Sequence, residues 1–453
     1  MANYDTIVAL ATATGSGAIA VIRLSGPEAI PLVNRVFKGK NLAEQASHTV
    51  HFGTLRDGAE VLDEVLVSLF IAPHSYTKEN VVEISTHNSR YIIERIIQLL
   101  IRQGARAARP GEFTLRAFLN GQMDLSQAEA VADLIASTSA ASHQVAMQQM
   151  RGGFSNVLKQ LREQLIQFAS LIELELDFSE EDVEFANRAQ LKALILEINN
   201  VIQKLIASFE QGNVLKNGVP VVIAGRPNVG KSTLLNTLLN EERAIVSDIA
   251  GTTRDTIEDE VNIQGVTFRF IDTAGIRDTL DVIEAKGVER TREKMKKARL
   301  IVYLADPQHD DLEEIKNQLA EVEQLDVPYV TVVNKVDLLT QEHVDTLYTI
   351  DPLFISAKNN VGVEELKAEL LHKVNLHDLG TDDVLVTNIR HVEALRKTED
   401  ALQRVLYGID GAVTSDFLAM DIRQALHHLG EITGSVSTDD LLDNIFSKFC
   451  IGK

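Results

Sequence analysis

The octapeptide Gly225-Arg-Pro-Asn-Val-Gly-Lys-Ser232 decides the fold of the middle of this chain. It follows the apolar run Val219-Pro-Val-Val-Ile-Ala224, which is typical of a buried strand, and precedes an apolar helix that begins near Thr233. Glycines at this spacing let backbone N–H groups close around phosphates, and the helix N-terminus adds its positive dipole. The segment therefore predicts a phosphate-binding loop, in which Lys231 reaches the β- and γ-phosphate oxygens and Ser232 ligates magnesium.

Two further motifs follow in the order that such a loop requires. Gly251-Thr-Thr-Arg-Asp255 lies in a polar stretch from which Thr253 can reach the metal and the γ-phosphate. The strand-like run Val266-Thr-Phe-Arg-Phe-Ile271 leads into Asp272-Thr-Ala-Gly275. This segment places a second carboxylate on the magnesium side and a glycine at the γ-phosphate.

A base-recognition motif comes next. The run Tyr329-Val-Thr-Val-Val333 ends at Asn334-Lys-Val-Asp337, and Ser356-Ala-Lys358 follows. The Asp337 carboxylate can accept from guanine N1–H and from the exocyclic amine, which discriminates against adenine by roughly 10⁴-fold. In this order the motifs resemble the translation-factor-related small GTPases. The predicted GTP-binding residues are Asn228, Val229, Gly230, Lys231, Ser232, Thr233, Ser247, Asp248, Ile249, Ala250, Gly251, Thr252, Thr253, Asp272, Thr273, Ala274, Gly275, Asn334, Lys335, Asp337, Ser356, Ala357 and Lys358.

The composition of the whole chain limits the number of domains and the classes of protein to be considered. With 453 residues, 45% hydrophobic and 24% charged, it predicts about three globular domains. The net charge of −21 argues against a broad basic face that wraps nucleic acid. A single cysteine, Cys450, excludes an internal disulfide. We found neither a basic signal segment nor an apolar window long enough for a membrane span, so we expect a cytoplasmic protein.

The first part of the chain, residues 1–121, has the pattern of an α+β domain. Short β-like runs occur at 19–24, 65–71 and 81–85, separated by turn signals. A helical pattern over 91–102 follows the third run. Because strands and helices mix here, we expect a small domain with its own sheet.

The remaining organisation is a helical domain with an insertion. Long amphipathic patterns fill 122–216 and 379–453, and a capping box at Ser126–Glu129 opens the first of them. The nucleotide motifs occupy 217–378, which predicts an inserted α/β P-loop (Ras-like) domain between two parts of one discontinuous all-α domain. The acidic segment Glu173–Glu184 is predicted to be a solvated connection rather than a metal site.

The hydrolytic step lacks its usual side chain in this sequence. Ile276 stands where Ras-like GTPases have the glutamine that orients the attacking water. Arg254 and Arg277 are candidates for an internal arginine finger, although structural roles are the better interpretation for both. A monovalent cation beside the phosphates can supply part of the missing positive charge.

Several stretches outside the nucleotide motifs make the chain resemble the MnmE (TrmE) family of tRNA-modification GTPases over nearly its whole length. They are Ile22-Arg-Leu-Ser-Gly-Pro27, Ala108-Arg-Pro-Gly-Glu-Phe-Thr114, Arg116-Ala-Phe-Leu-Asn-Gly121, Asp124-Leu-Ser-Gln-Ala-Glu-Ala-Val-Ala-Asp-Leu134 and the terminal Cys450-Ile-Gly-Lys453. The resemblance implies that two GTPase domains meet across a potassium ion during hydrolysis. By position, it implies potassium ligation by Asn228, Ser247, Ile249 and Thr252, and a water-orienting role for Glu284.

The resemblance also implies that the N-terminal domain forms a homodimer and binds a one-carbon tetrahydrofolate, either the 5,10-methylene or the 5-formyl derivative. Arg23, Glu83, Gln122 and Lys453 take the positions of folate contacts, and Cys450 that of a functional thiol. A structural ion pair between Arg23 and Glu83 is the alternative. Two departures stand out: Thr86-His-Asn-Ser89 replaces the family's Cys-His-Gly-Gly, and Gln122 replaces a common lysine.

In that family an FAD-dependent partner, MnmG (GidA), forms a heterotetramer or larger complex with the GTPase. Together they place a carboxymethylaminomethyl-type group on C5 of the wobble uridine of certain tRNAs. Two other hypotheses stay open: a ribosome-assembly GTPase that modifies no base, and a folate-dependent one-carbon transferase with a regulatory GTPase block.

Two further groups of residues give weaker signals. The basic clusters Arg102–Arg116 and Arg290–Arg299 are candidates for direct tRNA contact, although solvated helix faces are the more ordinary interpretation. His427 and His428 are adjacent and are therefore expected on different faces of a helix. We predict no zinc site there.

Overall fold

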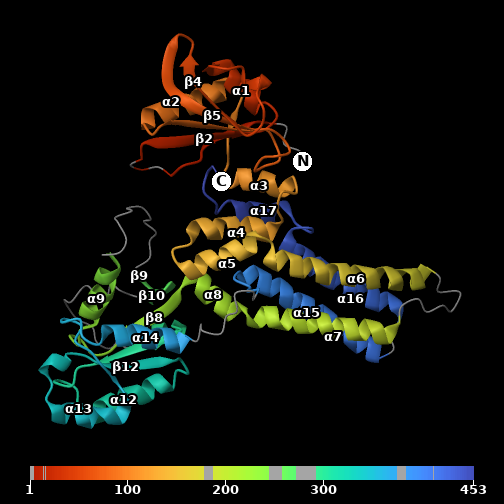
Figure 1. Ribbon diagram of the computed structural model, residues 1–453. Coiled ribbons are helices and arrows are strands. Elements are labelled where there is room, and N and C mark those ends of the chain that lie inside the picture. Colours follow the sequence, from red (N-terminus) through yellow and green to blue (C-terminus); the bar gives the residue numbers. More distant parts are fainter. Residues whose placement is uncertain are drawn as a thin grey trace. The chain divides into compact units, whose positions relative to one another are not determined.

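The computed structural model describes residues 5–13, 15, 17–177, 187–243, 258–271, 292–374, 384–411 and 413–452 (Figure 1). The chain divides into two compact units. The first consists of Met1–Ile135, Gln149–Ile202 and Glu393–Lys453, and the second of Ala136–Gln148 and Gln203–Val392. Within the described residues, no helix has the length and apolar character that crossing a membrane requires.

The first unit begins with a mostly antiparallel sheet. Its strands lie in the order β3-β4-β5-β6-β2-β1-β7, and only β1 and β7 pair in parallel. The strands are β1 (Ile7–Leu10), β2 (Ile19–Ser25), β3 (Phe37–Lys38), β4 (Thr49–Asp57), β5 (Glu60–Phe70), β6 (Val81–His87) and β7 (Arg106–Ala107). The three predicted strand runs coincide with β2, β5 and β6.

Two helices, α1 (Ala29–Val36) and α2 (Arg90–Arg102), pack on one face of this sheet. Strand alternation explains which residues form the core. Ile22 and Leu24 of β2 are fully buried against the helices, whereas Arg23, between them, lies on the opposite face. That opposite face is apolar over β4 and β5, where Phe52 is 66% exposed beside its cross-strand neighbour Leu66.

The all-α part combines helices from both ends of the chain. Its helices are α3 (Glu112–Leu119), α4 (Leu125–Ala136), α5 (Ala140–Met150), α6 (Gly153–Asp177), α7 (Arg188–Ala207), α15 (Ile389–Asp410), α16 (Ser415–Thr433) and α17 (Asp439–Phe446), of which α5 belongs mostly to the second unit. Helix α6 packs along α16, and Leu158, Leu165 and Ile172 of its periodic apolar stripe are buried. A discontinuous helical domain is therefore present, as the sequence predicts.

One local prediction in this part is wrong, and a second is wrong for the residues that the structure describes. The capping box is formed by Asp124 and Gln127, whose side chains each accept from the other's backbone N–H at 2.9 and 3.0 Å. Ser126 lies inside the helix and bonds to Ser155. The acidic segment is only partly a connection, because α6 continues to Asp177 and Glu175 is buried, 2.9 Å from Arg188. Residues 178–186 lie outside the described part.

The second unit contains a sheet with the strand order β13-β12-β11-β8-β10-β9, in which only β9 runs antiparallel to its neighbour. The strands are β8 (Val219–Ala224), β9 (Glu258–Ile263), β10 (Val266–Ile271), β11 (Leu300–Ala305), β12 (Tyr329–Val333) and β13 (Leu353–Phe354). The helices are α8 (Phe209–Asn217), α9 (Lys231–Arg243), α12 (Leu312–Glu323), α13 (Gln341–Leu347) and α14 (Val363–Val374).

Both faces of this sheet are covered, which explains the continuous apolar runs of its central strands. Val221 and Ile223 of β8 face the cluster that contains α9 and α14, whereas Val222 and Ala224 face the cluster that contains α12. This doubly wound arrangement places the loops that follow β8, β11 and β12 at the carboxyl ends of parallel strands, where α/β proteins bind ligands.

Candidate functional site

The predicted phosphate-binding loop connects β8 to α9, and its glycines are required by close backbone packing. Gly225 has a φ of +142°, and a Cβ there would lie 2.2 Å from the carbonyl oxygen of Leu304 in β11. Gly230 has a φ of +107°, and a Cβ there would lie 2.2 Å from Nδ2 of Asn334. The loop therefore cannot accept side chains at these positions, and its shape fits a cradle of backbone N–H groups for phosphate.

Lys231 begins α9 with its ammonium folded over this loop. Its Nζ donates to the carbonyl oxygens of Gly225 at 2.6 Å and Arg226 at 3.0 Å. Burial lowers the pKa of Lys231 below its ordinary value. An anion such as a phosphate group beside this ammonium stabilises the charged form. Ser232 is the next residue of the helix, as magnesium ligation requires.

The base-recognition loop is joined to the phosphate-binding loop by one buried side chain. Asn334 is 3% exposed; its Nδ2 donates to Val229 O at 2.8 Å and its Oδ1 accepts from Ala357 N at 3.0 Å. Asn334 thus ties together three separate predicted segments. Lys335 adds a second tie, because its Nζ donates to Asn228 O at 3.2 Å.

Asp337, the predicted guanine-reading residue, is exposed on the short 3₁₀ helix Val336–Leu338. The neighbouring Ser356 side chain, with smaller contributions from the Asp337 backbone, Lys358 and Asn359, holds the pKa of Asp337 below its ordinary value. The carboxyl group is therefore ionised at neutral pH and can accept two hydrogen bonds from a guanine edge. Ser356 and Ala357 are buried, while Lys358 is exposed.

Sequence reasoning missed Asp306, which follows the end of β11. It is 3% exposed and accepts from Lys335 Nζ at 2.6 Å and from His309 Nδ1 at 3.0 Å. Burial raises the pKa of Asp306, but these hydrogen bonds outweigh burial and the pKa lies below its ordinary value. Asp306 therefore holds the Lys335 ammonium beside the loops that are predicted to bind the nucleotide. An acidic residue directly after an apolar strand was the available signal.

The remaining predicted residues of this site lie outside the described part of the chain. They are Ser247, Asp248, Ile249, Ala250, Gly251, Thr252, Thr253, Arg254, Asp272, Thr273, Ala274, Gly275, Ile276, Arg277 and Glu284. The γ-phosphate, second-carboxylate and water-orienting roles therefore stay predictions.

A second group of predicted residues meets on the first sheet. Arg23 of β2 and Glu83 of β6 are directly cross-strand and form an ion pair at 2.7 Å. The guanidinium also lies 5.7 Å from the ring centroids of both Tyr76 and Phe113. Its Nη1 donates to the carbonyl oxygen of Gly452 at 3.3 Å. The C-terminal motif therefore reaches the ion pair from the far end of the chain.

Two other residues of the C-terminal motif behave differently. Cys450 is an exposed free thiol, and its backbone oxygen accepts from Gly111 N at 3.3 Å. Lys453 lies outside the described part.

Gln122 lines a separate cavity of about 390 Å³ together with Tyr76, His48 and His74. Tyr76 therefore contacts both the ion pair and this cavity.

The departure Thr86-His-Asn-Ser89 has its own arrangement at the end of β6. Asp63 is buried and accepts from the Thr86 hydroxyl, from His87 N at 2.8 Å and from His87 Nδ1 at 2.7 Å. Burial raises the pKa of Asp63, but these hydrogen bonds leave it below its ordinary value. The substituted motif is therefore stabilised by a buried carboxylate from β5.

The candidate tRNA-contact and metal residues also have defined surroundings. Arg106 and Arg116 of the first basic cluster are engaged by carboxylates, and Arg116 is 2% exposed. The expectation that His427 and His428 point to different faces is wrong, because their rings lie 5.5 Å apart. With Glu431 they form a partly exposed group whose ligand atoms lie within 4.8 Å of one another.

The glycine-dependent loop between β8 and α9, and the buried Asn334 that joins it to the segment at Ala357, lie on a doubly wound sheet and are the features of a P-loop GTPase. The family profiles "GTP-binding protein TrmE N-terminus" and "MnmE helical domain" match residues 6–122 and 125–450. The chain belongs to the MnmE family of tRNA modification GTPases.

Two curated relatives agree with that assignment. The tRNA modification GTPase MnmE of Cytophaga hutchinsonii is 61% identical over 452 residues, which span 100% of this chain and 98% of the relative. That of Christiangramia forsetii is 56% identical over 475 residues, spanning 99% of each. A crystal structure of Aquifex aeolicus Era bound to GDP.AlF4- is 27% identical, covers 40% of this chain and 66% of its own, and has a TM-score of 0.28.

Proposed function

We propose that this GTPase acts with an FAD-dependent partner of the MnmG (GidA) type. Together they add a carboxymethylaminomethyl-type group to C5 of the wobble uridine of certain tRNAs. The observation that carries the proposal is the Arg23–Glu83 ion pair reached by the backbone of Gly452. It supports a folate site because a guanidinium suits the glutamate carboxylates and a carboxylate suits the donor edge of a pterin.

The surroundings of the ion pair support an aromatic, anionic ligand. Tyr76 and Phe113 supply ring surface next to Arg23. The cavity of about 390 Å³ beside Tyr76 is lined by Gln122, which can hydrogen-bond but carries no charge. We propose that Arg23, Glu83, Gln122 and Lys453 hold a one-carbon tetrahydrofolate, which supplies the transferred carbon. Cys450 is proposed as the functional thiol at this end of the chain.

A homodimer is supported by the uncovered face of the first sheet. Val50, Phe52 and Leu66 are 60%, 66% and 46% exposed on neighbouring strands β4 and β5. Contiguous apolar surface of this kind is a feature of interfaces rather than of solvated faces. We propose that a second copy of the chain covers it, and that tRNA and the flavoprotein bind to this dimer.

For hydrolysis we propose magnesium ligation by Ser232 and Thr253, and potassium ligation by Asn228, Ser247, Ile249 and Thr252. Glu284 is proposed to orient the water. Asn228 supports the potassium assignment because it is exposed within the phosphate-binding loop, with a left-handed φ of +63°. Oxygen ligands suit both of these hard cations, and potassium supplies positive charge where Ile276 replaces glutamine.

Nucleoside mass spectrometry of bulk tRNA tests the whole proposal. Cells that lack the chain are expected to lose a C5-aminomethyl-type wobble uridine, and the wild-type chain should restore it. An unchanged nucleoside profile, together with co-sedimentation of the chain with ribosomal subunits, would instead support the ribosome-assembly alternative. Turnover of a small acceptor without tRNA or flavoprotein would support the folate-transferase alternative.

A further inference from the structure

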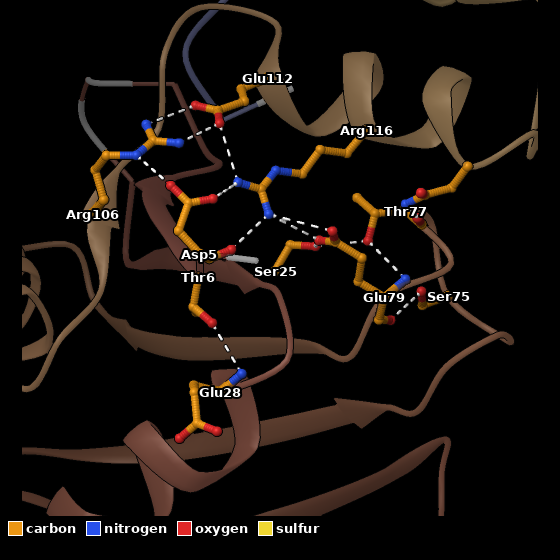
Figure 2. A network of polar contacts seen from close by, with 11 residues as sticks. Asp5, Thr6, Ser25, Glu28, Ser75, Thr77, Glu79, Arg106, Glu112 and Arg116 are labelled. Carbon is orange, nitrogen blue, oxygen red and sulfur yellow. Dashed lines mark hydrogen bonds and ion pairs between the residues drawn. The ribbon is translucent and has the colours of Figure 1, made fainter. Parts of the chain in front are cut away.

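A partly buried charge network lies where the first sheet meets α3, and the buried Arg116 is at its centre (Figure 2). Its Nη1 donates to Asp5 O at 2.8 Å and to both oxygens of Glu79 at 3.2 and 3.3 Å. Its Nη2 donates to Asp5 Oδ1 at 2.7 Å and Glu112 Oε1 at 3.2 Å. One guanidinium thus joins the strand start at β1, the loop before β6 and its own helix.

A second arginine completes the network from β7. Arg106 donates from Nε to Asp5 Oδ2 at 2.7 Å, and from Nη1 and Nη2 to Glu112 at 3.1 and 2.5 Å. Glu112 is 4% exposed and also accepts from Arg109 N at 2.7 Å. Glu79 in turn accepts from the Ser25 hydroxyl of β2 at 2.6 Å. The network therefore reaches the strand that carries Arg23.

The turn that holds the network also contacts the C-terminal segment and the aromatic side chains next to the Arg23–Glu83 pair. Gly111 donates its N–H to Cys450 O at 3.3 Å, and a Cβ at Gly111 would lie 2.6 Å from Phe446 O. Phe113 lies 5.7 Å from the Arg23 guanidinium, and Thr114 shares a 2.9 Å hydrogen bond with the Tyr76 hydroxyl. Residues 111–116 thus bind the C-terminal segment, the aromatic rings and the network within little more than one helical turn.

Such a network is expected to add little to the free energy of folding, because the cost of removing buried ions from water offsets much of their attraction. A planar guanidinium that bonds several carboxylates at once fixes orientation instead. We propose that Arg116 and Glu112 are positioning residues that set the first turn of α3 and thereby dock Cys450–Gly452 against β2. The consequence of this docking for folate binding rests on the proposed function: the tetrahydrofolate binds tightly only when Cys450–Gly452 is docked against β2.

Hydrogen exchange of the full chain, followed by mass spectrometry, tests the docking directly. Arg116→Lys replaces the planar guanidinium fork by a single ammonium nitrogen, and Glu112→Gln keeps the shape but removes one charge. Both are expected to accelerate exchange in peptides 109–119 and 446–452 by about tenfold or more. Peptides from α2 should stay unchanged. Arg95→Lys is the matched control, since Arg95 of α2 pairs with Asp57 of β4 and Glu60 of β5, away from the network.

Calorimetric titration with 5-formyl-tetrahydrofolate is the second readout. Affinity should fall about tenfold in both network variants and stay unchanged in the control. Unchanged exchange at 446–452 in both variants would overturn the positioning role, and faster exchange with unchanged affinity would overturn its link to the ligand. If the wild-type chain binds no folate, the proposed function fails, while the exchange result still decides the docking inference.

Discussion

Arg23 donates to the backbone carbonyl of Gly452 at 3.3 Å, across 429 positions of sequence. The contact depends on Gly452 having no side chain. Its φ is +95°, and a Cβ would lie 2.2 Å from Leu10 O and 3.0 Å from the Cα of Ala11. The C-terminal motif can therefore approach β1 and β2 only with glycine at this position.

Gly452→Ala is expected to push the C-terminal segment away from Arg23 and weaken binding of 5-formyl-tetrahydrofolate by about tenfold, measured by calorimetry. GTP hydrolysis without tRNA should be unaffected. The matched control is Gly58→Ala, where φ is +63° but nothing lies within 4 Å of the added Cβ. Equal affinities for Gly452→Ala and the wild type would show that the glycine contact is irrelevant to ligand binding.

Asp337→Asn should transfer nucleotide preference from guanine to xanthine, because the amide presents a donor where the carboxylate accepts. We expect GTP affinity to fall by roughly 10²-fold or more, with xanthosine triphosphate becoming the better ligand. Competition binding with the two nucleotides measures this. Asp326→Asn, a change in the same unit outside the nucleotide loops, should leave both affinities unchanged. A variant that still prefers guanine would remove Asp337 from the base pocket.

Replacing potassium by sodium at equal ionic strength should slow GTP hydrolysis by roughly 10²-fold, as expected for removal of charge stabilisation near the phosphates. Glu284→Ala should reduce turnover similarly and leave nucleotide affinity intact, since its proposed role is to orient water. Steady-state phosphate release and nucleotide binding separate the two effects. Glu313→Ala, which changes an exposed acid on α12, is the control. Equal rates in both salts would contradict the potassium assignment.

The phosphate and base motifs were predictable because each is a short contiguous pattern whose chemistry needs fixed spacing. The links between them were not. Asn334 bonds Val229 across 105 positions, and only the order of the parallel strands brings the two together. Arg116 and Asp5 are 111 positions apart, so the sequence shows two ordinary charged residues and no network.

The capping box was predicted at the wrong residues for a similar reason. Asp124 and Ser126 both precede the apolar pattern and both are good N-cap residues. The structure selects Asp124, whose carboxylate accepts from Gln127 N, while the Ser126 hydroxyl bonds to Asp124 and to Ser155 on α6. The tertiary partner at Ser155 decided the position, and no local pattern contains that partner.

The charge network predicts a pH dependence whose sign follows from Glu112. Burial raises its pKa, but hydrogen bonds from Arg106, Arg109 N and Arg116 outweigh burial, so the pKa in the folded chain lies below the ordinary 4.5. The unfolded chain therefore binds the proton first as pH falls. The stabilisation by ionised Glu112 is present above about pH 4.5 and is lost as pH falls through the folded pKa.

Glu112→Gln should consequently lower stability at pH 7, by about 1.5–3 kcal/mol for lost charge-assisted hydrogen bonds, and by progressively less toward acid. Wild type and variant converge at acid pH because the protonated carboxyl and the amide are then both neutral groups of similar shape. Urea unfolding of the full chain, followed at pH 7, 5, 4 and 3 through exchange of peptide 109–119, measures the difference. Glu94→Gln, an exposed partner of Arg90 on α2, should show a small difference at every pH. A Glu112→Gln deficit that stayed constant from pH 7 to pH 3 would mean that packing, rather than the ionised carboxylate, holds this turn of α3 in place.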